Sequence, residues 1–163
     1  MKTKVSCEKM LVSPLGPLRL GFSSQGLVRL DFLEPGDFPP ERDLESQPGW
    51  VQETLQALAA YFDGVAPAFE ALPLDLEGTP FQLRVWQELR VLPWGCTITY
   101  QELAARLGKP RACRAVGQAL KANPVAIVIP CHRVIAKDGS LGGYRAGADR
   151  KRWLLSHERQ TFR

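Results

Sequence analysis

The stretch Thr99–Lys121, TYQELAARLGKPRACRAVGQALK, decides the fold of the chain around it. Thr99 and Glu102 form a capping-box pattern, which predicts a helix that ends at Gly108. A proline two residues later interrupts the pattern, and a further helix is predicted from about residue 111 to residue 121. Two short helices joined by a tight break are typical of a helix-turn-helix.

The second of these helices has two unlike faces. The predicted apolar face consists of Ala112, Ala115, Val116, Ala119 and Leu120, and the polar face of Arg111, Arg114, Gln118 and Lys121. Because its alanines and Gly117 make this helix thin, its backbone is able to approach another surface closely. Arg114 is the one long basic side chain near its centre, which suits the minor groove or insertion into a base stack. A simple contact from Arg114 to a phosphate fits the spacing equally well.

Charge divides the chain into two predicted domains, residues 1–77 and residues 78–163. The first carries 6 Lys and Arg against 12 Asp and Glu, whereas the second carries 15 against 5. A domain this basic is typical of a nucleic-acid-binding surface, although a basic domain that binds no nucleic acid can carry the same charge. The composition, 45% hydrophobic and 23% charged, is that of a globular protein. No apolar run approaches the roughly 20 residues of a bilayer span and no secretion signal is evident, so a cytoplasmic location is expected.

The first domain has the pattern of a small sheet with a helix. Alternation over 18–22 and 28–32 predicts a β-hairpin with one solvated face. Residues 34–49, rich in proline, glycine and acid, predict a loop. Apolar residues at helical spacing over 51–62 predict a helix that Gly64 ends. No group of catalytic side chains is evident here, so this domain is expected to support the other.

The second domain begins with another helix start. Thr79 is the predicted N-cap, Pro80 is the first helical residue, and Gln82 completes the capping box. The apolar stripe that follows consists of Phe81, Val85 and Leu89.

A cysteine and a histidine lie side by side in the apolar stretch Ile127–Ile135, IVIPCHRVI. The β-branched run predicts a strand that stops at Pro130, where the chain should turn and expose Cys131. A thiol reacts as its thiolate, and a neighbouring base or positive charge lowers its pKa from about 8.5. His132 supplies an imidazole and Arg133 a positive charge. A structural cysteine beside a core histidine fits these residues as well.

Adjacent side chains of an extended chain point to opposite faces, so Cys131 and His132 would need a bridging water. Glu158 follows Leu154 by four residues and Leu155 by three, on the apolar face of a predicted helix. It is either a charge at the edge of that face or a buried partner for the imidazole. The four cysteines are scattered without metal-ligand spacing, so we expect free thiols, no metal and no other cofactor.

Six motifs of the second domain occur in the order found in one known family. They are Gly78-Thr79-Pro80-Phe81, Thr99-Tyr100, Arg114-Ala115-Val116-Gly117, Asn123-Pro124 with Ile129-Pro130-Cys131-His132-Arg133-Val134, Gly143-Tyr144, and Trp153-Leu154-Leu155-Ser156-His157-Glu158. This half of the chain resembles the O6-alkylguanine-DNA alkyltransferases, or methylated-DNA–protein-cysteine methyltransferases. The resemblance implies an α/β (α+β) fold, with an N-terminal ribonuclease-H-like domain and a C-terminal, mostly helical, winged-helix-like helix-turn-helix domain. Residues 1–77 match the family only in kind.

The same resemblance implies DNA repair by a single, irreversible transfer of an alkyl group from O6-alkylguanine, and from O4-alkylthymine, onto Cys131. It assigns His132 as the base, acting through a water, and Glu158 as the residue that orients the imidazole. Asn123 would brace the turn that carries the cysteine. Tyr100 would contact the base rotated out of the duplex and help to protonate the departing guanine.

The resemblance places the DNA and base contacts on further residues. Arg114 would fill the space left in the base stack, and Ala112, Ala115, Gly117 and Gln118 would lie along the minor groove. The base pocket would be lined by Pro130, Val134, Tyr144 and Arg145. The backbone carbonyls of Cys131 and Val134 would accept from the guanine amine, and the Arg145 amide would lie near O6. The implied partner is double-stranded DNA containing O6-alkylguanine, with no membrane or metal partner. We expect a monomer, leave cooperative loading on DNA open, and expect a nuclear location if the source is eukaryotic.

Other classes of protein remain open at this point. A lesion-binding relative without transfer activity would lack Cys131, and a helix-turn-helix regulator would bind an operator without taking up a methyl group. A thiol hydrolase fits less well, because no oxyanion-hole glycine motif surrounds Cys131. Cys96 and Cys113 are interpreted as structural thiols. Arg145 and Ala146 are larger than the residues of many relatives, so a narrower pocket is expected.

Overall fold

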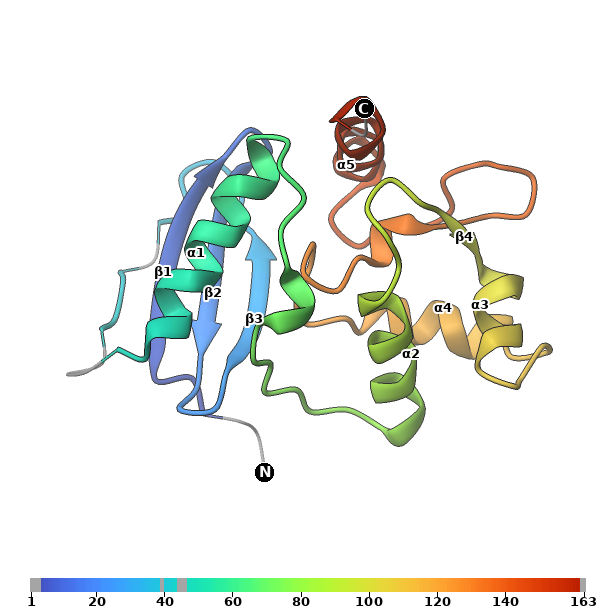
Figure 1. The fold of residues 1–163 in the computed structure, drawn as a ribbon, viewed down its shortest axis with the longest axis horizontal. Coiled ribbons are helices and arrows are strands. Elements are labelled where there is room, and N and C mark those ends of the chain that lie inside the picture. Colours follow the sequence, from blue (N-terminus) through green and yellow to red (C-terminus); the bar gives the residue numbers. More distant parts are fainter. Residues whose placement is uncertain (1–3, 39, 44–46, 162–163) are drawn as a thin grey trace. The chain divides into compact units, whose positions relative to one another are not determined.

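The computed structural model describes residues 4–38, 40–43 and 47–161, which form two compact units (Figure 1). Unit 1 contains the described residues up to 77 together with 124–126, and unit 2 contains 78–123 and the described residues from 127 onward. The mixed α/β class predicted from the sequence is confirmed, because unit 1 contains an antiparallel sheet and unit 2 is mostly helical. Among the described residues, no helix is long and apolar enough to cross a membrane.

Unit 1 is built on a three-stranded antiparallel sheet in the order β1 (Cys7–Ser13), β2 (Gly16–Phe22) and β3 (Leu27–Phe32). The predicted hairpin is confirmed, with Leu20 opposite Leu30. The sequence pattern does not predict β1, because most of its residues are half-buried and do not alternate clearly between core and solvent.

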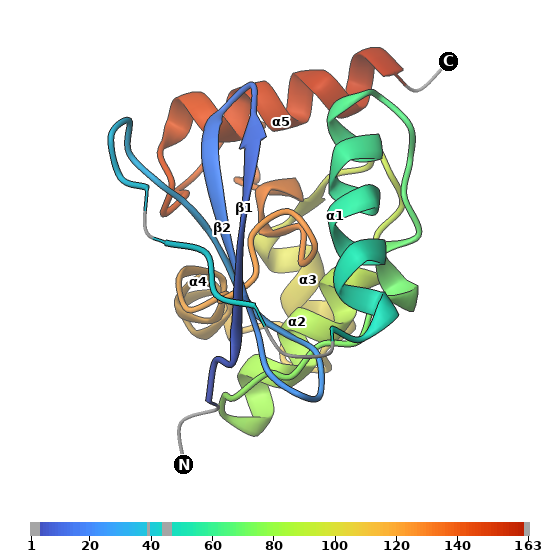
Figure 2. The same ribbon diagram turned by 90° about the vertical axis from the view of Figure 1, so that its left-hand side faces the viewer.

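A helix, α1 (Gly49–Phe62), lies across one face of this sheet (Figures 1 and 2). Its first turn places the Trp50 ring 5.8 Å from the ring of Phe22, between the ring centroids. Gly64 follows the helix with a φ of 83°, a left-handed conformation that favours glycine, so the predicted helix end is confirmed. A short 3-10 helix, η1 (Phe69–Ala71), then packs against α1 through stacked rings of Tyr61 and Phe69.

A short piece of the later chain completes unit 1. Val125 forms a parallel bridge with Leu30 of β3, and the Leu30 amide donates to the carbonyl of Pro124 at 2.9 Å. Residues 124–126 therefore belong to the sheet unit, although they lie far beyond residue 77 in the sequence. This long-range pairing fixes the chain a few residues before Cys131.

Unit 2 carries the helix-turn-helix. Its elements are α2 (Pro80–Arg90), β4 (Ile98–Thr99), α3 (Tyr100–Arg106), α4 (Cys113–Lys121), η2 (Cys131–Arg133), β5 (Val134–Ile135) and α5 (Ala148–Thr161). Both predicted capping boxes are confirmed, from Thr79 with Gln82 and from Thr99 with Glu102. The two short strands pair in parallel, with Ile98 opposite Val134.

Two details of the predicted α4 are wrong. The helix begins at Cys113 rather than near Arg111, because the chain after Pro110 forms a turn in which the Ala112 amide donates to the carbonyl of Lys109. Ala115 is exposed rather than part of the apolar face, which is centred on the buried Val116 and Ala119. Ala115 lies about 100° around the helix from Val116, at the edge of the stripe.

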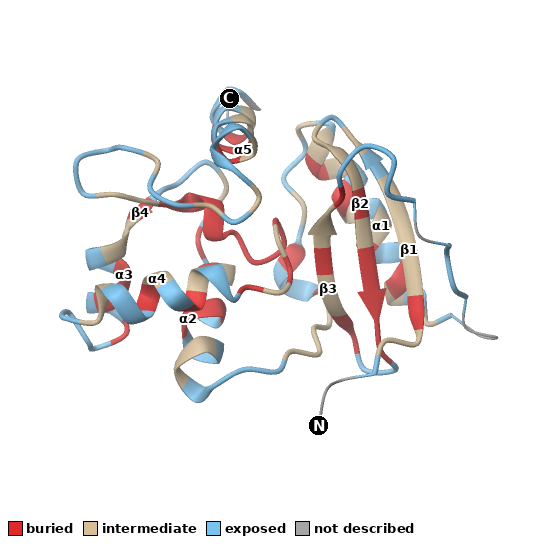
Figure 3. Ribbon diagram, turned by 180° about the vertical axis from the view of Figure 1, so that it is seen from behind, coloured by how far each residue is buried: buried red, intermediate tan, exposed pale blue. Residues whose placement is uncertain are grey.

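The predicted strand before Pro130 is also wrong. Residues 126–128 form turns, and Ile127 is fully buried with a φ of 71°. A left-handed conformation is costly for a β-branched residue, and it is held here by the packing around it. The segment is buried continuously from Ile127 to Val134 (Figure 3), which explains the apolar run that suggested a strand.

Candidate active site

Cys131 follows a tight turn at Pro130. The Cys131 amide donates to the carbonyl of Ile129 at 2.8 Å, and Pro130 has a φ of −80° and a ψ of 64°, which is an inverse γ-turn. The predicted turn at Pro130–Cys131 is therefore confirmed. Asn123 is buried and its Nδ2 donates to the same Ile129 carbonyl at 2.9 Å. Asn123 thus joins the end of α4 to the turn that carries the cysteine.

The sequence suggested that the Cys131 thiol is exposed at the end of the turn, but the structure shows that it is buried. Only 8% of Cys131 is accessible, because the chain continues from Cys131 into the 3-10 helix η2 instead of an extended segment. Burial raises the pKa of the Cys131 thiol. A side-chain hydrogen bond from Asn123 and the positive charges of Lys151 and Arg145 oppose this effect.

A buried ionic cluster lies beside the cysteine. Nε2 of His132 lies 2.6 Å from Oε1 of Glu158, which is contributed by α5, and both side chains are almost fully buried. Burial alone would raise the pKa of Glu158, but His132 and Arg133 outweigh it and lower this pKa to about 2. Glu158 is therefore ionised at neutral pH and only accepts hydrogen bonds, so Nε2 of His132 carries the proton.

The environment of the other ring nitrogen of His132, Nδ1, differs from that of Nε2. Nδ1 is buried and has no hydrogen-bond partner among the described residues. Because Nε2 is the donor to Glu158, Nδ1 is the basic nitrogen of a neutral imidazole. Burial lowers the pKa of His132, which keeps the ring neutral at pH 7. A buried acceptor without a partner, such as Nδ1, is able to take up a proton or to accept a hydrogen bond from an ordered water.

Lys151 is a site residue that the sequence reasoning missed. Its ammonium group is fully buried and donates to the carbonyl of Val134 at 2.6 Å and to that of Gly143 at 3.2 Å. Burial lowers the pKa of Lys151 to about 8, against the influence of Cys131. The signal in the sequence was its spacing, because Lys151 precedes Glu158 by seven residues and therefore shares the buried face of α5.

Two predicted pocket residues, Tyr144 and Arg145, lie on the loop between β5 and α5, whereas Val134 begins β5 and Pro130 precedes η2. The Tyr100 hydroxyl lies against this loop, where a Cβ on Gly142 would be 2.8 Å from its oxygen. Burial raises the pKa of Tyr100, and it raises the pKa of Tyr144 well above 10. The Tyr144 hydroxyl is buried without a partner among the described residues. Arg145 donates to the carbonyls of Lys121 and Asn123 at 3.3 and 3.2 Å, so it ties this loop to the end of α4.

Most of the predicted DNA-binding residues lie on α4 or, for Ala112, at its N-cap, while Tyr100 begins α3. Arg114, Ala115 and Gln118 are exposed, and Ala112 and Gly117 are partly exposed. A Cβ built on Gly117 would meet nothing within 4 Å. Packing within unit 2 therefore does not require a glycine at this position, which fits the close approach of an outside surface.

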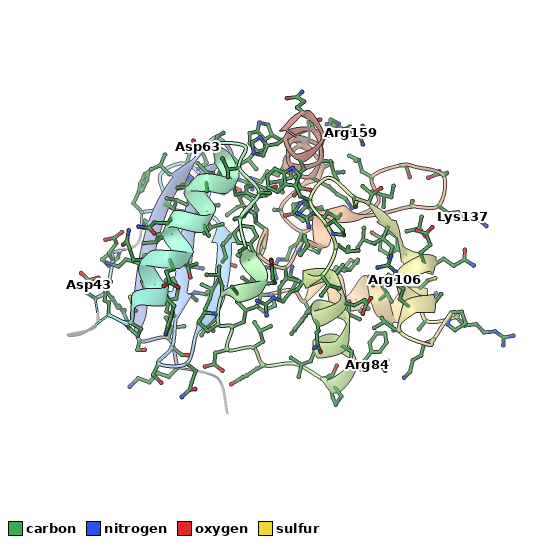
Figure 4. The ribbon with its side chains drawn as sticks, in the orientation of Figure 1. Asp43, Asp63, Arg84, Arg106, Lys137 and Arg159 are labelled. Carbon is green, nitrogen blue, oxygen red and sulfur yellow. The ribbon has the colours of Figure 1, made fainter. Side chains whose placement is uncertain are left out.

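Replacing Lys151 with methionine is expected to slow the alkylation of Cys131 by iodoacetamide about tenfold at pH 7.5, because loss of the adjacent cation raises the pKa of the thiol. The rate is measured by mass spectrometry of the peptide that contains Cys131. Lys137→Met removes an exposed lysine that points away from the ribbon (Figure 4) and should react like the wild type. The difference should shrink above pH 8, where Lys151 loses its charge. Equal rates for Lys151→Met and wild type at pH 7.5 would contradict the assignment.

These features define a class: a helix-turn-helix protein with a buried cysteine directly before a buried histidine that is paired with a carboxylate. Among the described residues no three metal-binding side chains gather as a metal site. Residues 80–160 match the family model of the 6-O-methylguanine DNA methyltransferase DNA-binding domain, and residues 7–76 match that of the ribonuclease-like domain of the same enzymes.

Similar proteins agree with these matches. A methylated-DNA–protein-cysteine methyltransferase of Salmonella typhimurium is 49% identical, over 93% of this chain and 94% of its own length. One of Methanosarcina barkeri is 44% identical, over 94% of this chain and 98% of its own. The crystal structure of Mycobacterium tuberculosis OGT in complex with DNA is 40% identical with a TM-score of 0.81, covering 94% of this chain and 93% of that one.

The chain belongs to the O6-methylguanine-DNA methyltransferase family. It is therefore an enzyme of DNA repair that transfers an alkyl group from DNA to a cysteine of the protein. The family resemblance seen in the sequence is confirmed.

Proposed function

We propose that Cys131 removes the alkyl group from O6-alkylguanine, and from O4-alkylthymine, in double-stranded DNA in one irreversible step. The observation that carries this proposal is a buried thiol in the residue directly before His132, whose Nε2 is fixed by Glu158 and whose buried Nδ1 has no partner in the described part of the chain. The other three cysteines are not proposed as the alkyl acceptor, because Cys96 is exposed, Cys7 belongs to unit 1, and Cys113 begins α4.

The transfer conserves atoms and charge as follows. The thiol proton passes through a water to Nδ1 of His132, and the thiolate attacks the alkyl carbon bonded to O6. An S–C bond forms while the C–O6 bond breaks, and its electron pair stays with the guanine. The guanine takes up one proton, for which the Tyr100 hydroxyl is the proposed donor. The product is a stable thioether, so each molecule acts once.

Access to the base requires its rotation out of the duplex. O6 of guanine lies within the base stack, and enzymes that react with such atoms flip the nucleotide into a pocket. We assign Arg114 to the space that the base leaves, and Ala112, Ala115, Gly117 and Gln118 to the minor groove. Pro130, Val134, Tyr144 and Arg145 are assigned to the base pocket. The Val134 carbonyl already accepts from Lys151, so the guanine amine would use its second lone pair.

The proposal is tested by the mass of the intact protein after incubation with a duplex that holds one O6-methylguanine, followed by peptide mapping. We expect a gain of one methyl group per molecule, located on Cys131. Tight binding to the lesion duplex without a change in mass would favour a lesion-binding protein. No change in mass and no preference for the lesion would leave only a helix-turn-helix DNA-binding protein. A second duplex with O4-methylthymine tests the wider substrate range.

Arg114→Ala is expected to slow repair of O6-methylguanine in a duplex on the order of 100-fold, because unstacking a base costs a few kcal/mol and each 1.4 kcal/mol is tenfold in rate. Transfer from free O6-benzylguanine, which needs no flipping, should change less than about twofold. Single-turnover rates with both substrates measure this difference. Arg106→Ala removes another exposed arginine of unit 2 and controls for the loss of one charge (Figure 4). Equal losses on both substrates would remove Arg114 from its flipping role.

A further inference from the structure

Arg133 is a buried cation that the proposed mechanism does not use. The sequence suggested that it adds positive charge at Cys131, but its hydrogen bonds go elsewhere. Nε donates to Oε2 of Glu158 at 2.8 Å, Nη2 donates to Oε1 at 3.0 Å, and Nη1 donates to the carbonyl of Leu92 at 2.7 Å. Only 5% of the residue is exposed, so the guanidinium is held in one position by these contacts.

The Arg133 guanidinium forms a fork of two hydrogen bonds, from Nε and Nη2, which fixes the Glu158 carboxylate against the imidazole. Oε1 of Glu158 accepts from both Nε2 of His132 and Nη2 of Arg133, while Oε2 accepts from Arg133. A bidentate guanidinium sets the plane of a carboxylate as well as its position. The backbone of Glu158 is held too, because Nε1 of Trp94 donates to its carbonyl at 2.9 Å. One oxygen of Glu158 is therefore kept facing His132.

The fork also determines the charge of the cluster. The charged groups that face His132 are Glu158 and Lys151 from α5 and Arg133 from η2, with the thiol of Cys131 beside it. Arg133 neutralises Glu158, so the pair is balanced while His132 is uncharged. Without Arg133, a protonated imidazole would offset more of the charge of the buried carboxylate. Such an imidazolium carries a proton on Nδ1 and has no basic nitrogen left.

We propose that Arg133 is a positioning residue for the alkyl transfer, which orients and neutralises Glu158 so that His132 remains a neutral base with Nδ1 free. This inference rests on the function proposed above, in which His132 takes the thiol proton. The direction of the His132 pKa agrees: burial lowers it, Glu158 raises it, and Arg133 and Lys151 lower it further. Removing Arg133 therefore takes away one of the influences that keep the ring neutral.

The test follows the ring nitrogens of His132 by ¹⁵N NMR as pH is varied, in wild type and in Arg133→Met. The wild type should show a neutral ring with the proton on Nε2 at pH 7, because burial lowers the pKa of His132 below the usual imidazole range. In Arg133→Met the pKa of His132 should rise by about one unit or more. The rate of transfer from free O6-benzylguanine should fall most at the acidic end of the profile. An unchanged His132 titration in Arg133→Met would overturn the proposal and leave Arg133 a packing role.

Further variants separate charge from folding. Arg133→Lys keeps the charge without the fork, so it should keep a low His132 pKa and lose rate by misorienting Glu158. Arg133→Met with Glu158→Gln removes both charges and should restore the low pKa without restoring the rate. Arg152→Met removes an exposed arginine of α5, paired with Asp149, and should match wild type. If Arg133→Met does not fold, these variants decide: a raised His132 pKa in Arg133→Lys or the double variant would overturn the proposal.

The NMR readout does not depend on alkyl transfer. A wild-type protein that takes up no methyl group on Cys131 would refute the proposed function. An Arg133→Met protein with an unshifted imidazole would refute the role of Arg133 while leaving that function in place.

Discussion

Cys131→Ser is expected to abolish the gain of a methyl group from O6-methylguanine DNA while leaving affinity for the lesion duplex within about twofold, because DNA binding rests on phosphate and groove contacts rather than on the nucleophile. A serine hydroxyl is not ionised near pH 7, and the contacts of Asn123 and Lys151 that favour a thiolate do not produce an alkoxide. The rate of transfer should therefore fall by at least about 10⁴-fold. Intact mass measures the transfer, and fluorescence anisotropy with a labelled duplex measures the binding.

The remaining cysteines provide matched controls for this substitution. Cys96→Ser and Cys113→Ser change an exposed and a partly buried thiol of the same unit and should both take up one methyl group at the wild-type rate. Uptake by Cys131→Ser, or loss of uptake in either control with its fold intact, would contradict the assignment of Cys131 as the acceptor.

The parts of the fold that the sequence predicts are those determined by neighbouring residues. The capping boxes at Thr79 and Thr99 are closed by side chains three residues away, so the local sequence contains the whole signal. The hairpin of β2 and β3 is likewise local. The turn before Pro130 is not, because it depends on the pairing of Val125 with Leu30 and on the bond from Asn123 to Ile129. An apolar run such as residues 127–129 fits a buried turn as well as a strand.

The site, like the fold, was predictable from the sequence only as far as local spacing determines it. Spacing alone placed Glu158 on an apolar helix face but left open whether it is buried, and the partnership with His132 came from the family resemblance. The structure adds that Arg133 completes the cluster and that Lys151 is buried beside it. Basic residues on a helix are usually solvated, so the spacing of Lys151 from Glu158 was by itself a weak reason to place this lysine inside. The assignment of roles to these residues remains a prediction that the substitutions test.

Acid is expected to destabilise the wild type through Glu158. The pKa of this carboxyl is lowered in the folded protein from 4.5 to about 2, because His132 and Arg133 together outweigh the effect of burial. The unfolded chain therefore binds a proton more readily than the folded chain between these two values. The stability that Glu158 contributes, about 3 kcal/mol, is fully present above pH 4.5 and is lost as pH falls toward 2.

Glu158→Gln removes this titration and is expected to change the free energy of unfolding in two ways. At pH 6 the variant should be about 3 kcal/mol or more less stable than wild type, because Arg133 is left buried without its carboxylate. At pH 3 the difference should be smaller by about 2 kcal/mol, since the wild type has then lost most of the contribution of Glu158. Urea unfolding at both pH values measures the two differences, and the titration of His132 is followed by NMR in both proteins, because Glu158 raises the pKa of His132 and its loss changes that titration. A stability gap that stays constant between pH 6 and pH 3 would show that Glu158 is not held ionised by His132 and Arg133.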